Sequence, residues 1–279
     1  MSDPVLTTTV SCLDRLDIYK RDKPFELRFP APDGFPQKNM VVSEYTDVKV
    51  HDVRGQENQL SLEKNGFFVM KLHQTLEPAD FDSTETIRSK YLPQVAETLK
   101  GRLGASRVIV HDYLVRKSHK KFPVATGEVY KWEQPANLLH IDSTPNGTRQ
   151  VFHGLSQRLL NELSSKRCQY VTVWKPIVGP VRKWPLMMVD TSTVKADVDL
   201  EARDMVYYDH VVETHLVYNS DDYKFNYLSN QTTDEAWVIL QTDSGTLTGT
   251  PHSSFRNPLA SDSDPERQSI EVRTLVFYD

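Results

Sequence analysis

The chain has 279 residues, of which 38% are hydrophobic and 25% are charged, with a formal net charge of −5 at pH 7. This composition is that of an ordinary soluble globular protein, and the length is enough to bury a large core. The weak negative charge gives no general reason to expect a nucleic-acid partner or a membrane surface.

The two cysteines and the N-terminus indicate where such a protein would work. Cys12 and Cys168 are too few for a disulfide framework and fit a reducing compartment. The first residues lack the charged and apolar regions of a signal peptide, and no apolar stretch approaches the ~20 residues of a membrane span. We therefore expect a soluble, cytoplasmic protein.

Residues 1–65 are polar and rich in turn-forming residues. Within them, residues 30–36 contain three prolines and a glycine, which predicts a loop. We interpret residues 1–65 as an N-terminal extension with little regular structure that packs on the core. Residues 66–279 then form one domain, because no domain boundary is apparent after residue 107.

The following segment predicts a strand, a helix and a second strand. Aromatic and β-branched residues after a glycine predict a strand over residues 66–72. From Asp82 a helical pattern runs to about Leu103. Its apolar residues are spaced for one helix face: Ile87, Tyr91, Val95 and Leu99. Residues 108–115 have the character of a well-buried strand.

A basic segment, residues 116–128, follows that strand and leaves two interpretations open. A solvated basic loop is the more common outcome for such a run of charges. The alternative is a flexible lid over a functional site, because long loops often carry function.

The rest of the chain favours a β-rich fold. A short strand over residues 137–142 is followed by a helix from Thr148 to about Lys166. Seven further segments are strand-like: 169–174, 186–190, 205–208, 215–218, 225–228, 237–241 and 269–278. Many short strands separated by turns predict a mainly β fold with flanking helices, arranged as a sandwich, jelly roll or barrel.

The strand over residues 137–142 carries a candidate metal site. His140 and Asp142 are two residues apart, so on a strand their side chains project from the same face. A third ligand could come from His252, and two histidines with one carboxylate form the facial triad of non-haem Fe(II) oxygenases. About one His-x-acid match is expected by chance from this composition. Taken alone, the motif therefore favours a packed or surface histidine.

A polar face on the last predicted strand strengthens the case for a site. Alternation places Arg267, Ser269, Glu271 and Arg273 on one face. Two buried arginines need an anionic partner, which could be Glu271 or the carboxylate of a small molecule. The arginines lie roughly 20 Å apart along an extended strand, so both cannot bind one small molecule. We favour Arg267 with Ser269 as the anion site. Arg273, the alternative, would then pair with Glu271.

Five sequence blocks together resemble one protein family. They are HIDSTPNG, VWKPIVGPVRKWPLMMVD, DEAWVILQTDSG, GTPHSSF and ERQSIEVRTLVFYD, and the similarity covers roughly residues 107–279. The chain resembles the fungal hydroxylase/desaturase family, which includes gibberellin desaturase-like, meroterpenoid-tailoring and cephalosporin-methoxylation relatives. The resemblance implies a double-stranded β-helix (jelly roll or cupin-like) core, with Fe(II), 2-oxoglutarate and O₂ as cofactor and co-substrates. It also implies oxidation of an apolar secondary metabolite, a terpenoid or meroterpenoid.

Position by position, the resemblance assigns His140, Asp142 and His252 as iron ligands. Arg267 and Ser269 match the Arg-x-Ser pattern that contacts the C5 carboxylate of 2-oxoglutarate. One departure is the 14-residue gap between His252 and Arg267, which is longer than in plant relatives. This departure keeps open which arginine binds the carboxylate.

The implied chemistry allows three outcomes at the substrate: hydroxylation, desaturation or endoperoxide formation. A pocket for such a substrate should be apolar and aromatic. Six residues flank the predicted site strands and could line it: Tyr113, Tyr130, Trp132, Trp184, Met187 and Tyr227. For each of them, ordinary core or edge packing is the alternative.

Two rival functions stay open at this point. One is a non-catalytic jelly-roll binding protein, in which His140 and His252 are packed residues. The other is a methyltransferase, because some relatives carry that label, although no G-x-G-x-x-G follows a predicted strand. As the partner we expect a small-molecule substrate, with a homodimer as a possible assembly.

Overall fold

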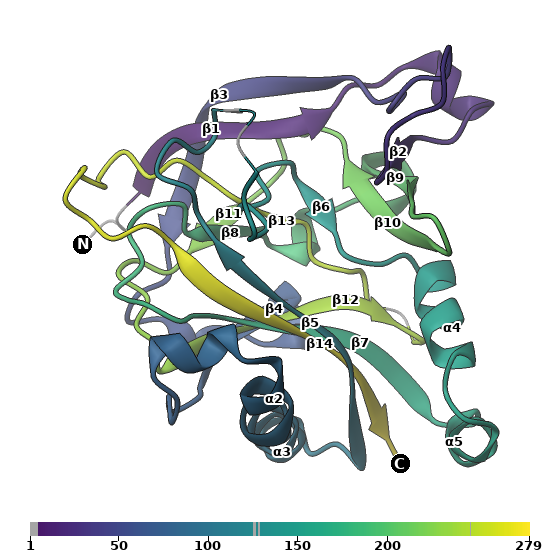
Figure 1. Cartoon of the computed structure of the whole chain (residues 1–279), viewed down its shortest axis with the longest axis vertical. Helices are drawn as coiled ribbons and strands as arrows, with labels where there is room; N and C mark the ends of the chain where they lie inside the picture. The colour runs from purple at the N-terminus through teal and green to yellow at the C-terminus, as the bar shows by residue number, and fades with distance from the viewer. Residues whose placement is uncertain (1–4, 125–126, 128, 246) are drawn as a thin grey trace.

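The molecule is built from two facing β-sheets and a layer of helices (Figure 1). The computed structural model describes residues 5–124, 127, 129–245 and 247–279. The larger sheet has nine strands in the order β1-β3-β11-β8-β13-β6-β10-β9-β2. The smaller sheet has five strands in the order β4-β12-β7-β14-β5. The predicted mainly β fold with flanking helices is confirmed.

The larger sheet brings together strands that are far apart in sequence. Its strands are β1 (Val5–Leu13), β2 (Phe25–Leu27), β3 (Val42–Asp52), β6 (His140–Ile141), β8 (Leu186–Val189), β9 (Leu200–Val206), β10 (Val211–Val217), β11 (Phe225–Tyr227) and β13 (His252–Ser254). Strand β13 lies between β8 and β6 and is antiparallel to both. This pairing places the two strands that carry predicted histidine ligands side by side.

The smaller sheet closes the other side of the core. Its strands are β4 (Phe67–Lys71), β5 (Arg107–Lys117), β7 (Arg167–Pro176), β12 (Glu235–Asp243) and β14 (Gln268–Tyr278). Strand β14 pairs with β5 on one side and β7 on the other, antiparallel to both. Apolar residues of the two sheets pack together, for example Trp174 and Ile239 against Met188. Their burial is the main favourable contribution that holds the sheets together.

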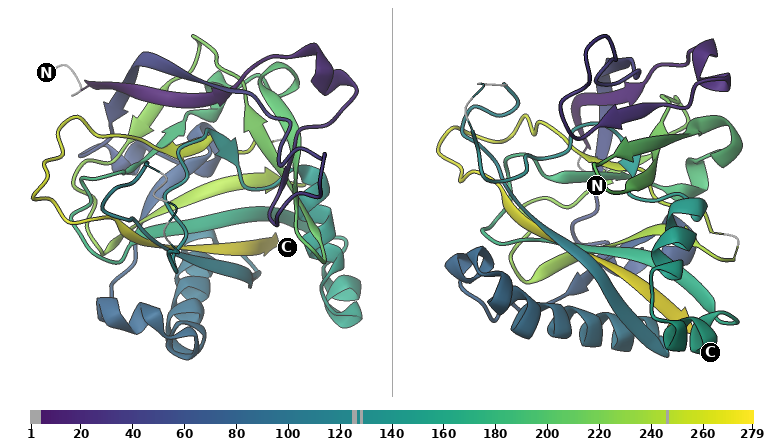
Figure 2. Two further views of the ribbon diagram at one scale, coloured as in Figure 1. Left: turned by 45° about the horizontal axis from the view of Figure 1, so that its top comes forward. Right: turned by 45° about the vertical axis from the view of Figure 1, so that its right-hand side comes forward.

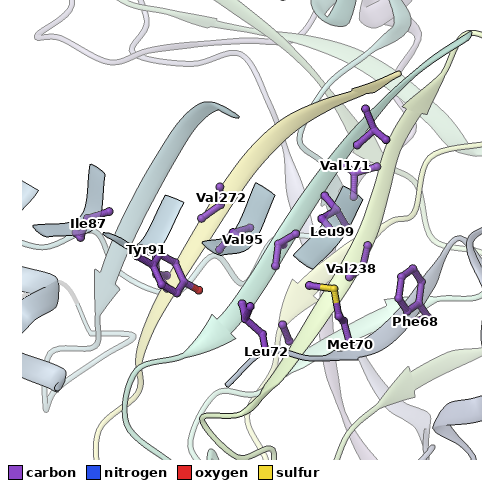
Figure 3. Packing of buried hydrophobic residues seen from close by; sticks show 14 of the residues in the cluster. Phe68, Met70, Leu72, Ile87, Tyr91, Val95, Leu99, Val171, Val238 and Val272 are labelled. Atoms are coloured by element: carbon purple, nitrogen blue, oxygen red, sulfur yellow. The ribbon is translucent and has the colours of Figure 1, made fainter. Parts of the chain in front are cut away.

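Helix α3 (Leu92–Leu103) covers the outer face of the smaller sheet (Figure 2). Figure 3 shows Tyr91, Val95 and Leu99 packed against Val171 and Val272 of the sheet. The apolar stripe that the sequence predicts is buried, and each such side chain contributes about 1.5–3 kcal/mol.

Both predicted helices are interrupted. The first consists of α2 (Thr84–Thr86), a π-helical turn at Ile87–Tyr91, and α3. Pro93 has no N–H to donate to the carbonyl four residues earlier, which accounts for the wide turn. The second consists of α4 (Pro145–His153) and α5 (Gln157–Leu163), with Gly154 between them.

The remaining regular elements are short. They are the helices α1 (Leu62–Asn65) and α6 (Ala196–Asp199), and the 3-10 turns Asp17–Lys20, Glu57–Gln59, Pro78–Asp82 and Thr191–Thr193. Among the residues that the structure describes, no helix is long and apolar enough to cross a bilayer.

The prediction of little regular structure in residues 1–65 is wrong. Strand β1 pairs with β3, and β3 joins the larger sheet alongside β11, so both belong to that sheet (Figure 2). Along β1 the buried residues alternate with exposed ones, and Leu6 and Val10 point inward. Threonine and serine at alternate positions fit a strand that is buried on one face only. The division into residues 1–65 and a domain of residues 66–279 stays a prediction.

Candidate metal centre

Two neighbouring strands of the larger sheet bring three potential metal ligands together. His140 on β6 and His252 on β13 are directly opposed partners, and their ring centroids lie 4.6 Å apart. Asp142 immediately follows β6. Its Oδ1 lies 3.4 Å from Nε2 of His140 and 3.8 Å from Nε2 of His252. The donor atoms of the three residues lie within 4.8 Å of one another.

Backbone carbonyl groups fix how both imidazole rings face this point. Nδ1 of His140 lies 2.7 Å from the carbonyl oxygen of Leu138, and Nδ1 of His252 lies 3.0 Å from that of Thr250. A carbonyl can only accept, so each Nδ1 carries the hydrogen and donates it. Each Nε2 therefore keeps its lone pair and points it toward Asp142, as in metal-binding histidines.

The charge states of the cluster also suit a cation. Burial lowers the pKa of His252, and the adjacent His140 lowers it further, so this imidazole is neutral near pH 7. Burial opposes ionisation of Asp142. The nearby Arg273 guanidinium nevertheless favours the charged carboxylate, and the pKa of Asp142 lies well below the usual range. Two imidazoles and one carboxylate are the donor set of a non-haem Fe(II) site, so these residues fit that metal.

A pocket opens beside these three residues, between the two sheets. In addition to the two histidines, its lining consists of Arg116, Ala136, Thr172, Trp174, Leu186, Ile239, Arg267 and Glu271. The lining is apolar on one part and strongly charged on another, which suits a ligand with an anionic end.

Arg267 is a buried cation that no described carboxylate pairs. It is 3% exposed, its Nη1 donates to the carbonyl oxygen of Trp184 at 2.9 Å, and its Nε has no hydrogen-bond partner. Burial and the nearby charge of Arg116 lower its pKa to about 9. Ser269 is fully buried, and its hydroxyl also has no partner among the described residues. Buried polar groups are rarely left unpaired, so this pair of residues fits a bound anion.

Arg273 differs because its charge is fully compensated. Its Nη1 donates to Oδ2 of Asp112 at 2.8 Å, and its Nη2 donates to Oε1 of Glu271. Glu271 also forms an ion pair with Arg116 at 3.2 Å. Despite its burial, the charge of Glu271 and then that of Asp142 raise the pKa of Arg273. The ion pair between Arg273 and Glu271, which the sequence predicts, is present.

Comparison with known proteins places this geometry in a family. Residues 16–277 match the family model described as oxidoreductase/YMDC permease-like domain. Over 238 residues, covering 82% of each chain, the sequence is 30% identical to the Fe(II)/2-oxoglutarate-dependent dioxygenase nvfI of Aspergillus novofumigatus (strain IBT 16806). The chain belongs to the family of Fe(II)/2-oxoglutarate-dependent dioxygenases.

One further relative and one solved structure support the same family for this chain. It is 30% identical to the alpha-ketoglutarate-dependent dioxygenase phiK of a fungal species (strain ATCC 74256), over 89% of this chain and 93% of the relative. A solved structure of the iron and alpha-ketoglutarate-dependent endoperoxidase NvfI superposes with a TM-score of 0.85 at 26% identity, covering 100% and 99% of the two chains. The predicted double-stranded β-helix core and the use of Fe(II), 2-oxoglutarate and O₂ are thereby confirmed. The rival prediction of a methyltransferase and that of a non-catalytic binding protein are set aside.

Four of the predicted substrate-pocket residues lie away from the metal centre. Tyr113 and Trp132 line a second cavity of about 440 Å³ beside β5. Met187 and Tyr227 are buried in a core cluster that belongs to the opposite face of β8 and β11. On β8 it is Leu186 that lines the pocket, because neighbouring residues on a strand point to opposite faces.

The other two predicted residues lie in loops. Trp184 contributes its carbonyl oxygen to Arg267, and its ring meets that of Phe122 at 4.6 Å. Tyr130 is 41% exposed, and its ring contacts that of His119.

Sequence reasoning missed several residues of the pocket lining. Thr172, Trp174, Ile239 and Arg116 line it. Alternation groups Thr172 with Trp174 on one face of β7 but gives no direction, because β7 is buried on both faces.

Residues 116–128, for which a solvated loop and a lid both stay open, are only partly within the described chain, since residues 125, 126 and 128 lie outside it. The described part contacts Arg267 and Trp184. The N–H of Ser118 donates to the carbonyl oxygen of Arg267 at 2.8 Å, and the ring of Phe122 packs on Trp184. Whether this segment moves stays a prediction.

Proposed function

We propose that the enzyme holds Fe(II) with His140, Asp142 and His252, and that Arg267 and Ser269 bind the C5 carboxylate of 2-oxoglutarate. One observation carries this proposal. Two Nε2 atoms and one carboxylate oxygen converge beside a buried arginine that has no carboxylate partner among the described residues.

The iron, 2-oxoglutarate and O₂ supply the oxidising chemistry, in which 2-oxoglutarate loses CO₂ to give succinate and the substrate is oxidised. The protein positions the reactants. Three protein ligands on one side leave the remaining coordination positions free for the keto acid and O₂. Arg267 offers a charged donor to the far carboxylate, and Ser269 offers a hydroxyl next to it.

The distribution of charge in the pocket supports Arg267 over Arg273 as the carboxylate-binding residue. Binding an anion at Arg267 pairs a buried cation that otherwise lacks a counter-ion. Binding at Arg273 would instead have to displace Glu271 or Asp112 from existing ion pairs.

For the substrate we propose an apolar secondary metabolite, a terpenoid or meroterpenoid. Support comes from Ala136, Leu186 and Ile239, which give the pocket its apolar part. The names of two relatives, the hydroxylase/desaturase efuI of Hormonema carpetanum and the endoperoxidase NvfI, support the types of oxidation we propose. The reaction we propose at the substrate is hydroxylation, desaturation or endoperoxide formation. We further propose a cytoplasmic enzyme that assembles as a monomer or a homodimer.

The test is a screen of candidate terpenoids with Fe(II), 2-oxoglutarate and O₂, reading succinate and product masses together. A gain of one oxygen atom, a gain of two, or a loss of two hydrogen atoms separates the three outcomes. The His252→Ala variant is the control and should form no succinate. If the parent chain neither binds iron nor consumes 2-oxoglutarate with any substrate, the proposed site is wrong.

A further inference from the structure

The two carboxylate oxygens of Asp142 have different surroundings. Oδ1 faces the histidine Nε2 atoms, at 3.4 and 3.8 Å. Oδ2 points the other way and accepts a hydrogen bond from the hydroxyl of Thr172 at 3.0 Å. Nε of Arg273 lies 4.0 Å from the same Oδ2, which is a charge interaction beyond hydrogen-bond length.

The groups that hold Asp142 come from the sheet opposite the one that carries the metal ligands. Thr172 on β7 is the directly opposed partner of Arg273 on β14, so their side chains are neighbours on the inner face. The backbone N–H of Asp142 donates to Oε1 of Gln241 on β12 at 2.8 Å. Three adjacent strands of the smaller sheet thus fix a residue that follows a strand of the larger sheet.

The hydroxyl groups of Thr172 and Thr274, two buried threonines on adjacent strands, have different partners. Thr274 on the neighbouring strand shows the ordinary arrangement, because its hydroxyl donates to the backbone carbonyl of Val171 at 2.8 Å. Thr172 is equally buried, at 2% exposed, but its hydroxyl reaches across to a carboxylate of the facing sheet. It also lines the pocket beside the two histidines.

We infer that Thr172 is a positioning residue that keeps Asp142 a one-oxygen ligand. Its hydroxyl occupies Oδ2, so only Oδ1 is presented to the metal. A carboxylate that bound through both oxygens would take one of the positions that 2-oxoglutarate and O₂ need. This inference rests on the proposed iron site and adds a role for a residue that is not itself a ligand. Partners of metal ligands of this kind typically change metal affinity 10–100-fold when removed.

The experiment measures metal binding by the apo protein, without 2-oxoglutarate and without turnover. Anaerobic titration with Co(II), followed by its absorption spectrum, gives both the dissociation constant and the coordination environment. We expect Thr172→Val to weaken Co(II) binding roughly 10–100-fold and to alter the spectrum. Thr172→Ser keeps the hydroxyl and should restore most of the parental affinity. Thr274→Val removes a hydroxyl that is just as buried and should leave Co(II) binding unchanged.

The outcomes separate this inference from the proposed function. If Thr172→Val binds Co(II) as tightly as the parent, with the parental spectrum, the positioning role is overturned. The same holds if Thr274→Val weakens binding to the same extent, because loss of packing then explains both. If the parent itself binds Co(II) no better than His252→Ala does, the iron site fails and the inference fails with it. If the valine variant does not fold, Thr172→Ala compared with Thr172→Ser makes the same distinction.

Discussion

The two ends of the polar face along β14 are compensated in opposite ways. At one end, Arg273 is paired with Glu271 and Asp112. At the other end, just before and within the strand, Arg267 and Ser269 keep buried polar atoms without partners among the described residues. The chemical groups are similar, and only their compensation differs.

This difference separates structural charge from charge that serves a ligand. In a buried ion pair each charge compensates the other, and removing one partner leaves the other charge buried and unpaired. A buried cation without a counter-ion destabilises the free protein, and an arriving anion reverses that cost. The residues near Arg267 therefore have the character of a binding site, and those near Arg273 have the character of a scaffold.

Removing a proposed metal ligand should have the largest effect, because both metal binding and the binding of 2-oxoglutarate beside Arg267 depend on it. We expect His252→Ala to abolish succinate formation and to weaken metal binding by more than the roughly 10–100-fold cost of losing a supporting partner. Metal content after reconstitution and succinate production check this, with circular dichroism to show that the fold persists. Parental metal content in this variant would remove His252 from the site.

Arg267→Gln should weaken 2-oxoglutarate binding by about 2–5 kcal/mol, the usual cost of truncating one partner of a buried charge pair. The same variant should leave the free protein as stable as the parent or more stable, because it removes an unpaired buried charge. Calorimetric titration with 2-oxoglutarate and denaturant unfolding without it check the two halves. A variant that binds 2-oxoglutarate normally would contradict the assignment.

Arg273→Gln is the matched control and should show the reverse pattern. We expect the free energy of unfolding to fall by about 3 kcal/mol, the lower end of the range for breaking a buried pair, because Arg273 is only partly buried and Glu271 keeps its contact with Arg116. The loss of 2-oxoglutarate affinity should be smaller than for Arg267→Gln. If the two variants exchanged these behaviours, Arg273 would be the carboxylate-binding residue.

Lys175 tests whether burial of a cation is by itself enough to indicate a binding site. It is fully buried, but its Nζ donates to Oε1 of Gln74 at 2.9 Å. Burial lowers its pKa to about 8. The unfolded chain, with the ordinary value of 10.5, therefore binds the extra proton between pH 8 and 10.5. The free energy of unfolding should consequently rise with pH across that window, and below it the charged lysine lowers stability.

Lys175→Met should remove this pH dependence and stabilise the protein at pH 7 by about 1–3 kcal/mol, since each pKa unit corresponds to about 1.4 kcal/mol. Urea unfolding of the parent and the variant at pH 7, 8, 9 and 10 measures the difference. The affinity for 2-oxoglutarate should not change. An unaltered pH slope would show that Lys175 is not the group that titrates.

The site was more predictable from sequence than the framework around it. The spacing of His140 and Asp142 on a strand, and of Arg267 and Ser269 on another, is local information that survives in any β-rich fold. The meeting of His140 with His252 depends on a strand pairing over a long stretch of chain. The sequence offered His252 as a candidate third ligand, and the family resemblance then supported that choice.

The remaining differences have physical causes. The prediction for residues 1–65 weighed their turn-forming residues and left out the three threonines and two valines of β1, which favour a strand. Met187 lies in a core cluster while its neighbour Leu186 lines the pocket, because a shift of one residue turns a strand side chain to the other face. Thr172 could not be placed, since a strand buried on both faces has no polar alternation to show which face looks inward.

The most direct test is an anaerobic titration of the Fe(II)-loaded protein with 2-oxoglutarate, followed by the visible charge-transfer band that a keto acid chelated to Fe(II) produces. The parent should develop the band, and His252→Ala should not. Arg273→Gln should require close to the parental concentration of 2-oxoglutarate, and Arg267→Gln roughly 30-fold more or higher, the equivalent of about 2 kcal/mol. A parent without the band, or an Arg267→Gln variant that titrates like the parent, would contradict the account.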